Sequence, residues 1–145
     1  MTARGTTLHG DWTGVYDYGD NGDDASADPV PFTASLFDIA GAVWGTTREP
    51  NTFAPDAGDE LHASVNGTRS GREVRFRKTY RGRPKGGEVP IDYAGHVMRD
   101  GNRIEGRWQL AIPGRMIAGS FVMNRKPGVA AVATRVETAE DEISV

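Results

Sequence analysis

The sequence predicts an all-β protein in which eight strands form a closed antiparallel up-and-down barrel. Apolar and polar residues alternate in short segments over most of the chain, which is the period of a strand with one buried face. Tight turns join several of these segments, and pairing across four of the turns places apolar residues on one face each time. Because eight sequential strands leave two open edges unless the sheet closes, we expect a barrel with an enclosed interior.

The turn at Asp100-Gly101 gives the clearest register. A two-residue hairpin there brings together residues that are all apolar, aromatic or Gly: Val97 with Ile104, Gly95 with Gly106, Tyr93 with Trp108, and Ile91 with Leu110. The residues between them are mostly polar. A slip of one residue would mix the two sets, so the alternation specifies this register strongly.

Three further turns, Ala40-Gly41, Ser70-Gly71 and Pro113-Gly114, extend the pairing. The expected partners are Leu36 with Gly45, Ala34 with Thr47, Val65 with Phe76, Ala63 with Lys78, Leu61 with Tyr80, Leu110 with Ile117, Trp108 with Gly119, and Ile104 with Met123. The strands are expected at about 11–18, 30–38, 42–49, 59–66, 72–81, 91–97, 104–110 and 116–125.

The connections predict a barrel with two different ends. Three tight turns fall at one end, whereas long loops at 19–29, 50–58 and 82–88 fall at the other end, where we expect a mouth. A length of 145 residues fits a single domain. We expect a flexible N-terminus over 1–9, the barrel over 10–125, and a disordered tail over 126–145, where the alternation is lost.

Composition argues against several classes of function. The chain has no Cys, which removes disulfides and thiolate chemistry. Its formal net charge of -3 disfavours nucleic-acid binding, and no apolar run is long enough for a membrane span. Residues 1–9 lack the apolar core of a secretory signal, so the expected location is cytoplasmic. We expect no cofactor and no metal site, since His62 and His96 face outward and His9 precedes the first strand.

The ends of the barrel segment carry a short motif. Gly10-Asp11-Trp12 opens the first strand and Arg125 closes the last one. With the strand count, this pattern resembles the calycin superfamily, which includes lipocalins, fatty-acid-binding proteins and avidins. The resemblance implies a structural stack of Arg125 on Trp12 at the closed base and a cavity for a small molecule. It names no ligand, and the chain lacks the Cys residues of secreted lipocalins.

Polar and aromatic side chains on the inward face mark the candidate site. Most of them should lie in the half of the barrel near the mouth. The expected lining of a ligand-binding cavity is Tyr16, Tyr18, Phe32, Glu49, Lys78, Tyr80, Tyr93 and Trp108. These residues combine inward position with polar or aromatic character, as ligand sites do.

Lys78 is the most informative of these residues, because an ammonium on an inward face is costly unless it is paired. Glu49 is the inward carboxylate near the same level. Three interpretations stay open. The two residues could form a buried ion pair with tyrosine hydroxyls around it. Lys78 and the tyrosines could bind an anionic or carbonyl group of a ligand, or a desolvated Lys78 could act as a base or nucleophile, with Tyr80 as the acid.

The pattern as a whole predicts a protein that binds a hydrophobic or amphipathic small molecule. The alternatives are a cofactor-free barrel enzyme (an isomerase, cyclase or lyase) that uses Lys78, Glu49 and Tyr80, and an interaction module with a filled barrel. Phe37 and Trp44 point outward and pair across the second hairpin, which predicts a contact surface for a homo-oligomer.

Overall fold

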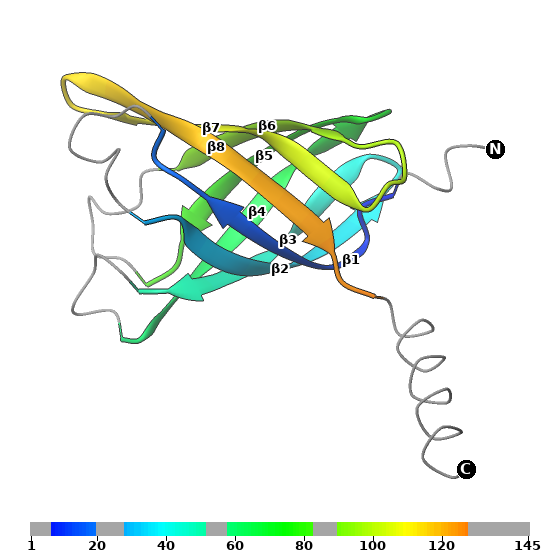
Figure 1. Cartoon of the computed structure of the whole chain (residues 1–145), viewed down its shortest axis with the longest axis horizontal. Coiled ribbons are helices and arrows are strands. Elements are labelled where there is room, and N and C mark those ends of the chain that lie inside the picture. Colours follow the sequence, from blue (N-terminus) through cyan, green and yellow to red (C-terminus); the bar gives the residue numbers. More distant parts are fainter. Residues whose placement is uncertain (1–6, 20–27, 52–57, 83–89, 128–145) are drawn as a thin grey trace, which may run out of the picture.

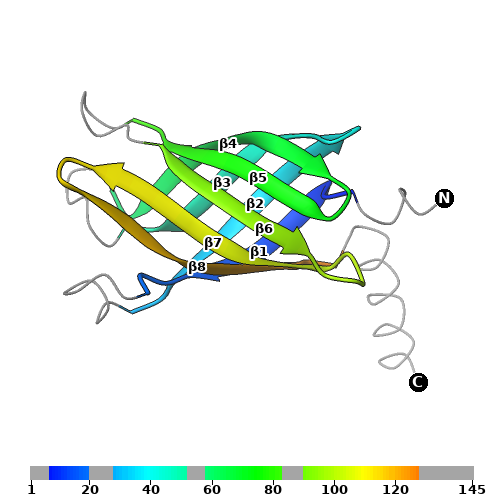
Figure 2. The same ribbon diagram turned by 90° about the horizontal axis from the view of Figure 1, so that it is seen from above.

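The computed structural model confirms the all-β class. Eight strands form one closed antiparallel barrel in which each strand pairs with its neighbours in sequence and the first pairs with the last (Figures 1 and 2). The strands are β1 (Gly10–Tyr16), β2 (Val30–Ile39), β3 (Ala42–Pro50), β4 (Glu60–Ser70), β5 (Glu73–Tyr80), β6 (Ile91–Val97), β7 (Arg103–Ile112) and β8 (Arg115–Arg125). The described residues are 7–19, 28–51, 58–82 and 90–127. No helix among them is long and apolar enough to cross a membrane.

Several expectations concern segments outside the described residues. These segments are most of the N-terminal residues 1–9, nearly all of the tail 126–145, and most of the loops 19–29, 50–58 and 82–88. The positions of the described strands and turns are enough to distinguish the two ends of the barrel. The β7–β8 turn lies at the left end in Figure 1, and the β6–β7 turn lies at the opposite end.

Three of the four expected hairpin registers are confirmed. The matching pairs include Tyr93–Trp108, Gly95–Gly106, Leu36–Gly45, Ala34–Thr47, Trp108–Gly119 and Ile104–Met123. The turn between β2 and β3 has positive φ at both central residues, 52° at Ala40 and 91° at Gly41. This is the arrangement of a type I′ turn, whose twist matches that of the flanking strands.

The predicted register between β4 and β5 is wrong by two residues. Lys78 pairs with Val65 and not with Ala63, whose partner is Tyr80. Because side chains alternate with a period of two residues, an even error leaves every residue on its predicted face. The observed inward and outward faces of these strands therefore agree with the prediction. The predicted positions of their side chains along the barrel axis do not.

The cause of this error is the turn at Gly71. Ser70 pairs with Glu73, so the central residues are Gly71 and Arg72. Gly71 has a φ of 62°. Glycine in the first central position is typical of a type II′ hairpin turn, which accepts a positive φ there without steric strain. The expected turn placed this glycine second, and β4 consequently continues beyond its predicted end near residue 66.

Two glycines let neighbouring strands approach closely. A Cβ atom at Gly45 would lie 1.9 Å from the carbonyl oxygen of Ser35, and one at Gly106 would lie 2.1 Å from that of Ala94. Both distances are far shorter than a van der Waals contact, and the backbone oxygens cannot move aside. Glycine at these positions therefore permits the sharp coiling of a small barrel.

The stack of Trp12 and Arg125 is confirmed at the closed end. The two residues pair in the β1–β8 ladder, and the guanidinium carbon lies 4.5 Å from the centre of the indole ring. Arg125 also donates to the carbonyl oxygens of Thr7 and His9 at 2.7 and 2.8 Å. The Trp12 indole N–H donates to the Leu8 carbonyl at 2.9 Å, and both side chains are fully buried. The segment before β1 thus seals this end of the barrel.

A second polar contact, which the sequence analysis did not predict, lies at the same end. The buried carboxylate of Asp38 accepts hydrogen bonds from the Arg69 guanidinium at 2.5 Å, the Leu8 N–H at 2.8 Å and the Gly41 N–H at 3.1 Å. Burial alone would raise the pKa of Asp38, but these bonds, above all that from Arg69, hold it below its ordinary value. The ionised carboxylate therefore joins β2, β4 and the N-terminal segment.

Trp12→Ala is expected to lower the free energy of unfolding by about 3–5 kcal/mol, because it removes a buried ring and leaves a cavity. Urea unfolding followed by circular dichroism measures the loss. The control is Met116→Ala, at a residue that is 55% exposed on the outer surface, and it should change stability by about 0.5 kcal/mol or less. If Trp12→Ala costs no more than this control, Trp12 does not hold the closed end together.

Candidate functional site

Five inward polar side chains meet in one buried group, which we call the tyrosine–lysine cluster. Its members are Tyr16 from β1, Glu49 from β3, Lys78 and Tyr80 from β5, and Tyr93 from β6, each 9% exposed or less. All five alternate with exposed residues along their strands, so the strand period places them inside. Tyr16, Glu49 and Tyr80 lie where long connections leave the barrel.

Glu49 is the centre of this cluster. Its Oε1 lies 2.6 Å from Lys78 Nζ, and its Oε2 accepts a 2.6 Å hydrogen bond from the Tyr16 hydroxyl. The Tyr80 hydroxyl donates to both carboxylate oxygens at 3.1 Å. The side chains of Lys78 and Glu49 are 2% and 0% exposed. The structure therefore contains a buried ion pair completed by tyrosine hydroxyls, the first of the three interpretations of Lys78.

Aromatic rings surround the Lys78 ammonium. Nζ lies 4.8 Å from the centre of the Tyr80 ring and 4.9 Å from that of Tyr16, and it donates to the Tyr93 hydroxyl at 3.4 Å. Burial lowers the pKa of Lys78, and the charge and hydrogen bond of Glu49 oppose this effect. The negative faces of the rings also attract a cation. The ammonium thus has support from the carboxylate and the rings in place of water.

The three tyrosines of the cluster act as neutral donors. Burial raises the pKa of Tyr16, Tyr80 and Tyr93, and the nearby Glu49 carboxylate adds to the effect. A phenol whose pKa is raised above 10 keeps its proton at physiological pH. Each hydroxyl therefore brings one O–H donor to the interior of the barrel.

The cluster contains more hydrogen-bond donors than acceptors that face them. Lys78 has three N–H groups, and among the described residues two acceptors face them, Glu49 and the Tyr93 hydroxyl oxygen. The proton of Tyr93 has no acceptor in that part of the chain. Thr47 Oγ1, two residues before Glu49 on the same face of β3, is buried and lacks a partner among the described residues. An occupant of this region would have to supply acceptors.

Phe32, Tyr18 and Trp108 complete the lining predicted from the sequence. Phe32 and Trp108 are buried, and Tyr18 is partly buried against the core. The Tyr16 ring meets those of Tyr18 and Trp108 edge-on, with centroids 6.0 Å apart in each case. The Trp108 indole N–H donates to the Asp17 carbonyl at 2.8 Å. Seven of the eight predicted residues are therefore buried in the barrel, and Tyr18, which follows the end of β1, is partly buried against the core.

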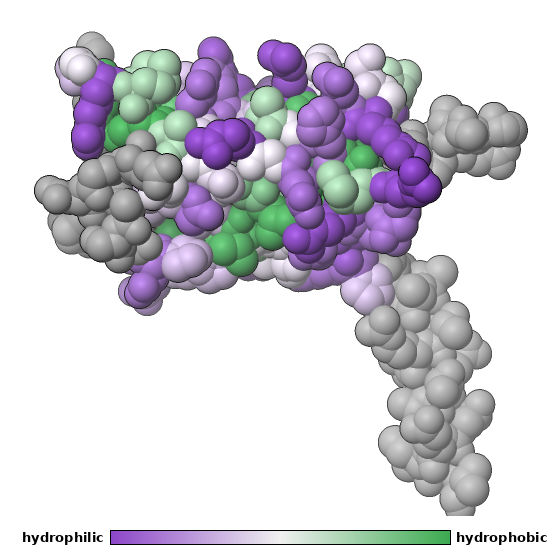
Figure 3. Space-filling model, turned by 45° about the horizontal axis from the view of Figure 1, so that its top comes forward, coloured by the Kyte–Doolittle hydropathy of each residue, from purple (hydrophilic) through white to green (hydrophobic). Residues whose placement is uncertain are grey.

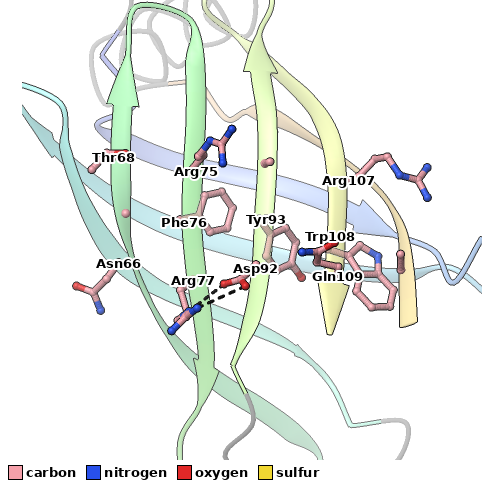
Figure 4. A pocket seen from close by; sticks show the side chains of 13 residues that line it. Asn66, Thr68, Arg75, Phe76, Arg77, Asp92, Tyr93, Arg107, Trp108 and Gln109 are labelled. Atoms are coloured by element: carbon pink, nitrogen blue, oxygen red, sulfur yellow. Dashed lines mark hydrogen bonds and ion pairs between the residues drawn. The ribbon is translucent and has the colours of Figure 1, made fainter. Parts of the chain in front are cut away.

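Three hollows of about 550–580 Å³ open on the outer wall of the barrel. One of them runs across β4 to β8 and is rimmed by Arg75, Arg77, Asp92 and Arg107 (Figure 4). Asp92 neutralises Arg77 at 2.9 Å. On the face shown in Figure 3, polar side chains are interspersed with apolar areas. These hollows fit a solvated outer surface, and none of the three is the interior cavity predicted for the eight lining residues.

Sequence reasoning missed Thr47 as a member of the site, although it placed this residue on the inward face. The available signal was a hydroxyl on the inward side of a strand, two residues from Glu49. His62 and His96 are exposed on the outer face, as expected. In the ranges that the structure describes, no group of three His, Asp or Glu side chains is placed to hold a metal ion.

Comparisons with known proteins do not identify a family. No family model, no curated protein and no solved structure matches the chain. The closed eight-stranded antiparallel barrel is consistent with a calycin-like fold. Because one fold serves many functions, the function has to be argued from the tyrosine–lysine cluster itself.

Lys78→Met is expected to cost about 3–5 kcal/mol of stability, because it leaves the buried Glu49 carboxylate uncompensated. The double variant Lys78→Met, Glu49→Leu should cost much less than the sum of the two single changes, since neither charge remains. Urea unfolding of the three variants measures the coupling. As a matched control on the exposed outer wall, Arg107→Met should change stability by about 0.5 kcal/mol or less. Additive losses would show that the two charges do not act as a pair.

Proposed function

We propose that the barrel binds a small, largely apolar molecule, whose polar group contacts the tyrosine–lysine cluster from the loop end. The observation that carries this proposal is the buried Lys78–Glu49 pair with three tyrosine hydroxyls around it, in the half of the barrel from which the long connections leave. Eight-stranded barrels enclose space for side chains or for one small ligand. A polar group set among apolar walls is the usual composition of a ligand site.

Stability alone is a weak reason for a buried ion pair. Removing two charges from water costs several kcal/mol, and well-packed apolar residues of similar volume are often as stable or more stable. The closed end contains such residues, among them Ile104 and Met123, which are 0% and 1% exposed, and the Asp38 carboxylate there is matched by Arg69 and by two backbone N–H groups. The polar character of the cluster at the loop end therefore supports recognition of a ligand.

A cofactor-free enzyme that uses Lys78, Glu49 and Tyr80 is the alternative, and the geometry supports it less well. Amine catalysis needs a neutral nitrogen that faces the substrate. Lys78 Nζ instead lies 2.6 Å from Glu49, which stabilises the charged form. The third possibility, an interaction module with a filled barrel, gives no role to the unused donors of Lys78, Tyr93 and Thr47.

The resemblance to calycins supports the same proposal. Binding of small molecules is the commonest use of those barrels. The Trp12–Arg125 stack at the closed end and the polar cluster at the other end fit such a division of the barrel. We propose on this basis that the chain is a lipocalin-like binding protein.

Native mass spectrometry of the freshly purified chain tests the proposed function. We expect a small-molecule adduct on the wild type that is lost on denaturation. The double variant Lys78→Met, Glu49→Leu keeps a neutral, apolar interior and should lose the adduct, whereas Arg107→Met on the outer wall should keep it. A wild type that carries no adduct and whose melting temperature no apolar small molecule raises would contradict the proposal.

We also propose that the chain self-associates through the outward face of the β2–β3 hairpin. Phe37 and Trp44 are 45% and 39% exposed and stack with centroids 5.5 Å apart, and Ile39 beside them is 64% exposed. His9 packs edge-on against Phe37 at 5.4 Å. Exposed aromatic side chains are enriched where proteins meet, which supports a contact between two copies.

Light scattering is expected to show a dimer of the wild type and a folded monomer of the variant Phe37→Glu, Trp44→Glu, because two charges oppose burial of this surface. Met116→Glu is the control, since Met116 is 55% exposed on β8 and away from the hairpin. This variant should remain dimeric. A wild type that is monomeric at high concentration would refute the self-contact.

A further inference from the structure

We infer that the polar group of the ligand is a neutral hydrogen-bond acceptor, such as the carbonyl oxygen of a ketone, ester or amide, and not a carboxylate. This inference rests on the proposed function, because it names the class of molecule that the same cluster takes. Two properties of the cluster carry it: the excess of donors and the balance of charge.

The unused groups in this region are donors. Tyr93 has a hydroxyl proton without an acceptor among the described residues, and Lys78 has three N–H groups for two acceptors. Thr47 adds a buried hydroxyl with no partner in the described ranges. The acceptors, by contrast, are in use, since Glu49 receives Lys78, Tyr16 and Tyr80. A ligand that only donates would leave the protons of Lys78 and Tyr93 without an acceptor, whereas an oxygen acceptor can take them up.

The charges of the cluster already cancel. Lys78 and Glu49 are the charged members of the cluster, since the three tyrosines stay neutral, and their charged atoms are 2.6 Å apart. A carboxylate brought beside Lys78 would therefore also approach Glu49, and two carboxylates without a second cation repel each other strongly in a region with little water. A carbonyl oxygen accepts the same hydrogen bonds without adding a charge.

The surrounding side chains describe the rest of the ligand. Rings of Tyr16, Tyr18 and Trp108 meet edge-on, and Phe32 lies against Tyr16 with its ring tilted by 40°. Apolar and aromatic surroundings of this kind favour a mainly apolar ligand body. The inferred ligand is therefore a mainly apolar molecule that carries a neutral carbonyl group.

Three probes with the same ring system separate the possibilities. 2-Acetylnaphthalene carries a neutral carbonyl, 2-naphthoate carries a carboxylate, and 2-ethylnaphthalene carries no acceptor. Isothermal titration calorimetry with the full chain is expected to show 2-acetylnaphthalene binding about tenfold more tightly than each of the other two, which is the factor expected of one net hydrogen bond.

Three variants test the two properties separately. Tyr93→Phe and Thr47→Val each remove one hydroxyl donor and keep the ion pair, so each should reduce the advantage of 2-acetylnaphthalene over 2-ethylnaphthalene, while the N–H groups of Lys78 stay in place. Glu49→Gln removes the negative charge and leaves Lys78 unbalanced, so the preference should reverse in favour of 2-naphthoate. Circular dichroism shows whether each variant is folded, and if Glu49→Gln is not, the wild type and Tyr93→Phe still decide the result.

The outcomes distinguish this inference from the function on which it rests. If 2-naphthoate or 2-ethylnaphthalene binds the wild type as tightly as 2-acetylnaphthalene, the barrel binds small molecules but the inferred ligand class is wrong. If neither Tyr93→Phe nor Thr47→Val reduces the ketone preference, the donor argument fails. If none of the three probes binds and the purified chain carries no adduct, the proposed function fails together with the inference.

Discussion

The pairing of β1 with β8 is the constraint on which the rest of the structure depends. It places Trp12 beside Arg125 and Tyr16 beside Phe121, and it removes the last unpaired edges of the sheet. Once the sheet is closed, every second residue of each strand faces a shared interior. A polar side chain at such a position cannot reach water sideways and must find a partner inside. The Lys78–Glu49 pair and the Asp38–Arg69 pair both meet that requirement.

The two ends meet the requirement differently. At the closed end, Asp38 is held by Arg69 and by backbone N–H groups, with Leu8 and Trp12 filling the space beneath. These contacts join the segment before β1 to the turns. The hydrogen bonds of the Asp38 carboxylate are all made with groups of the chain itself. At the loop end, Lys78 and Glu49 are paired, but the donors beside them exceed the acceptors. This contrast is why we propose that the closed end stabilises the fold and the loop end recognises a ligand.

The faces of the strands could be predicted from the sequence, and the heights of the side chains could not. The alternation of residues around Tyr93 and Trp108 defines inside and outside, so seven of the eight predicted lining residues are buried in the interior, and Tyr18 is partly buried against the core. Which inward residues touch depends on the register of each pair and on the tilt of the strands. Lys78 pairs with Val65 and Glu49 with Leu61, four residues apart on β4. Lys78 and Glu49 meet because their side chains extend along the barrel axis. The pairing of backbone residues across strands does not predict such a contact.

The same reasoning explains why the Asp38–Arg69 pair escaped prediction. Asp38 stands on the inward side of its strand, but Arg69 lay beyond the expected end of β4 because the turn was centred one residue too early. The unexpected position of Gly71 in its turn is therefore the reason that the Asp38–Arg69 pair was not predicted. It is also the reason that the predicted partner of Lys78 was wrong by two residues.

The charge balance of the interior gives the strongest limit on what the barrel can hold. An unpaired Lys in an apolar barrel would favour the binding of an anion. Here Glu49 is already the anion beside Lys78, and the hydroxyls of Tyr16 and Tyr80 hold its carboxylate in place. The tyrosines have raised pKa values and stay neutral, so they stabilise the carboxylate without adding a second charge. For the ligand that we propose, the cluster offers hydrogen-bond donors in a region without net charge. Such a region would select by the position of an acceptor atom and by the shape of the apolar remainder, and it would give no advantage to a charged group.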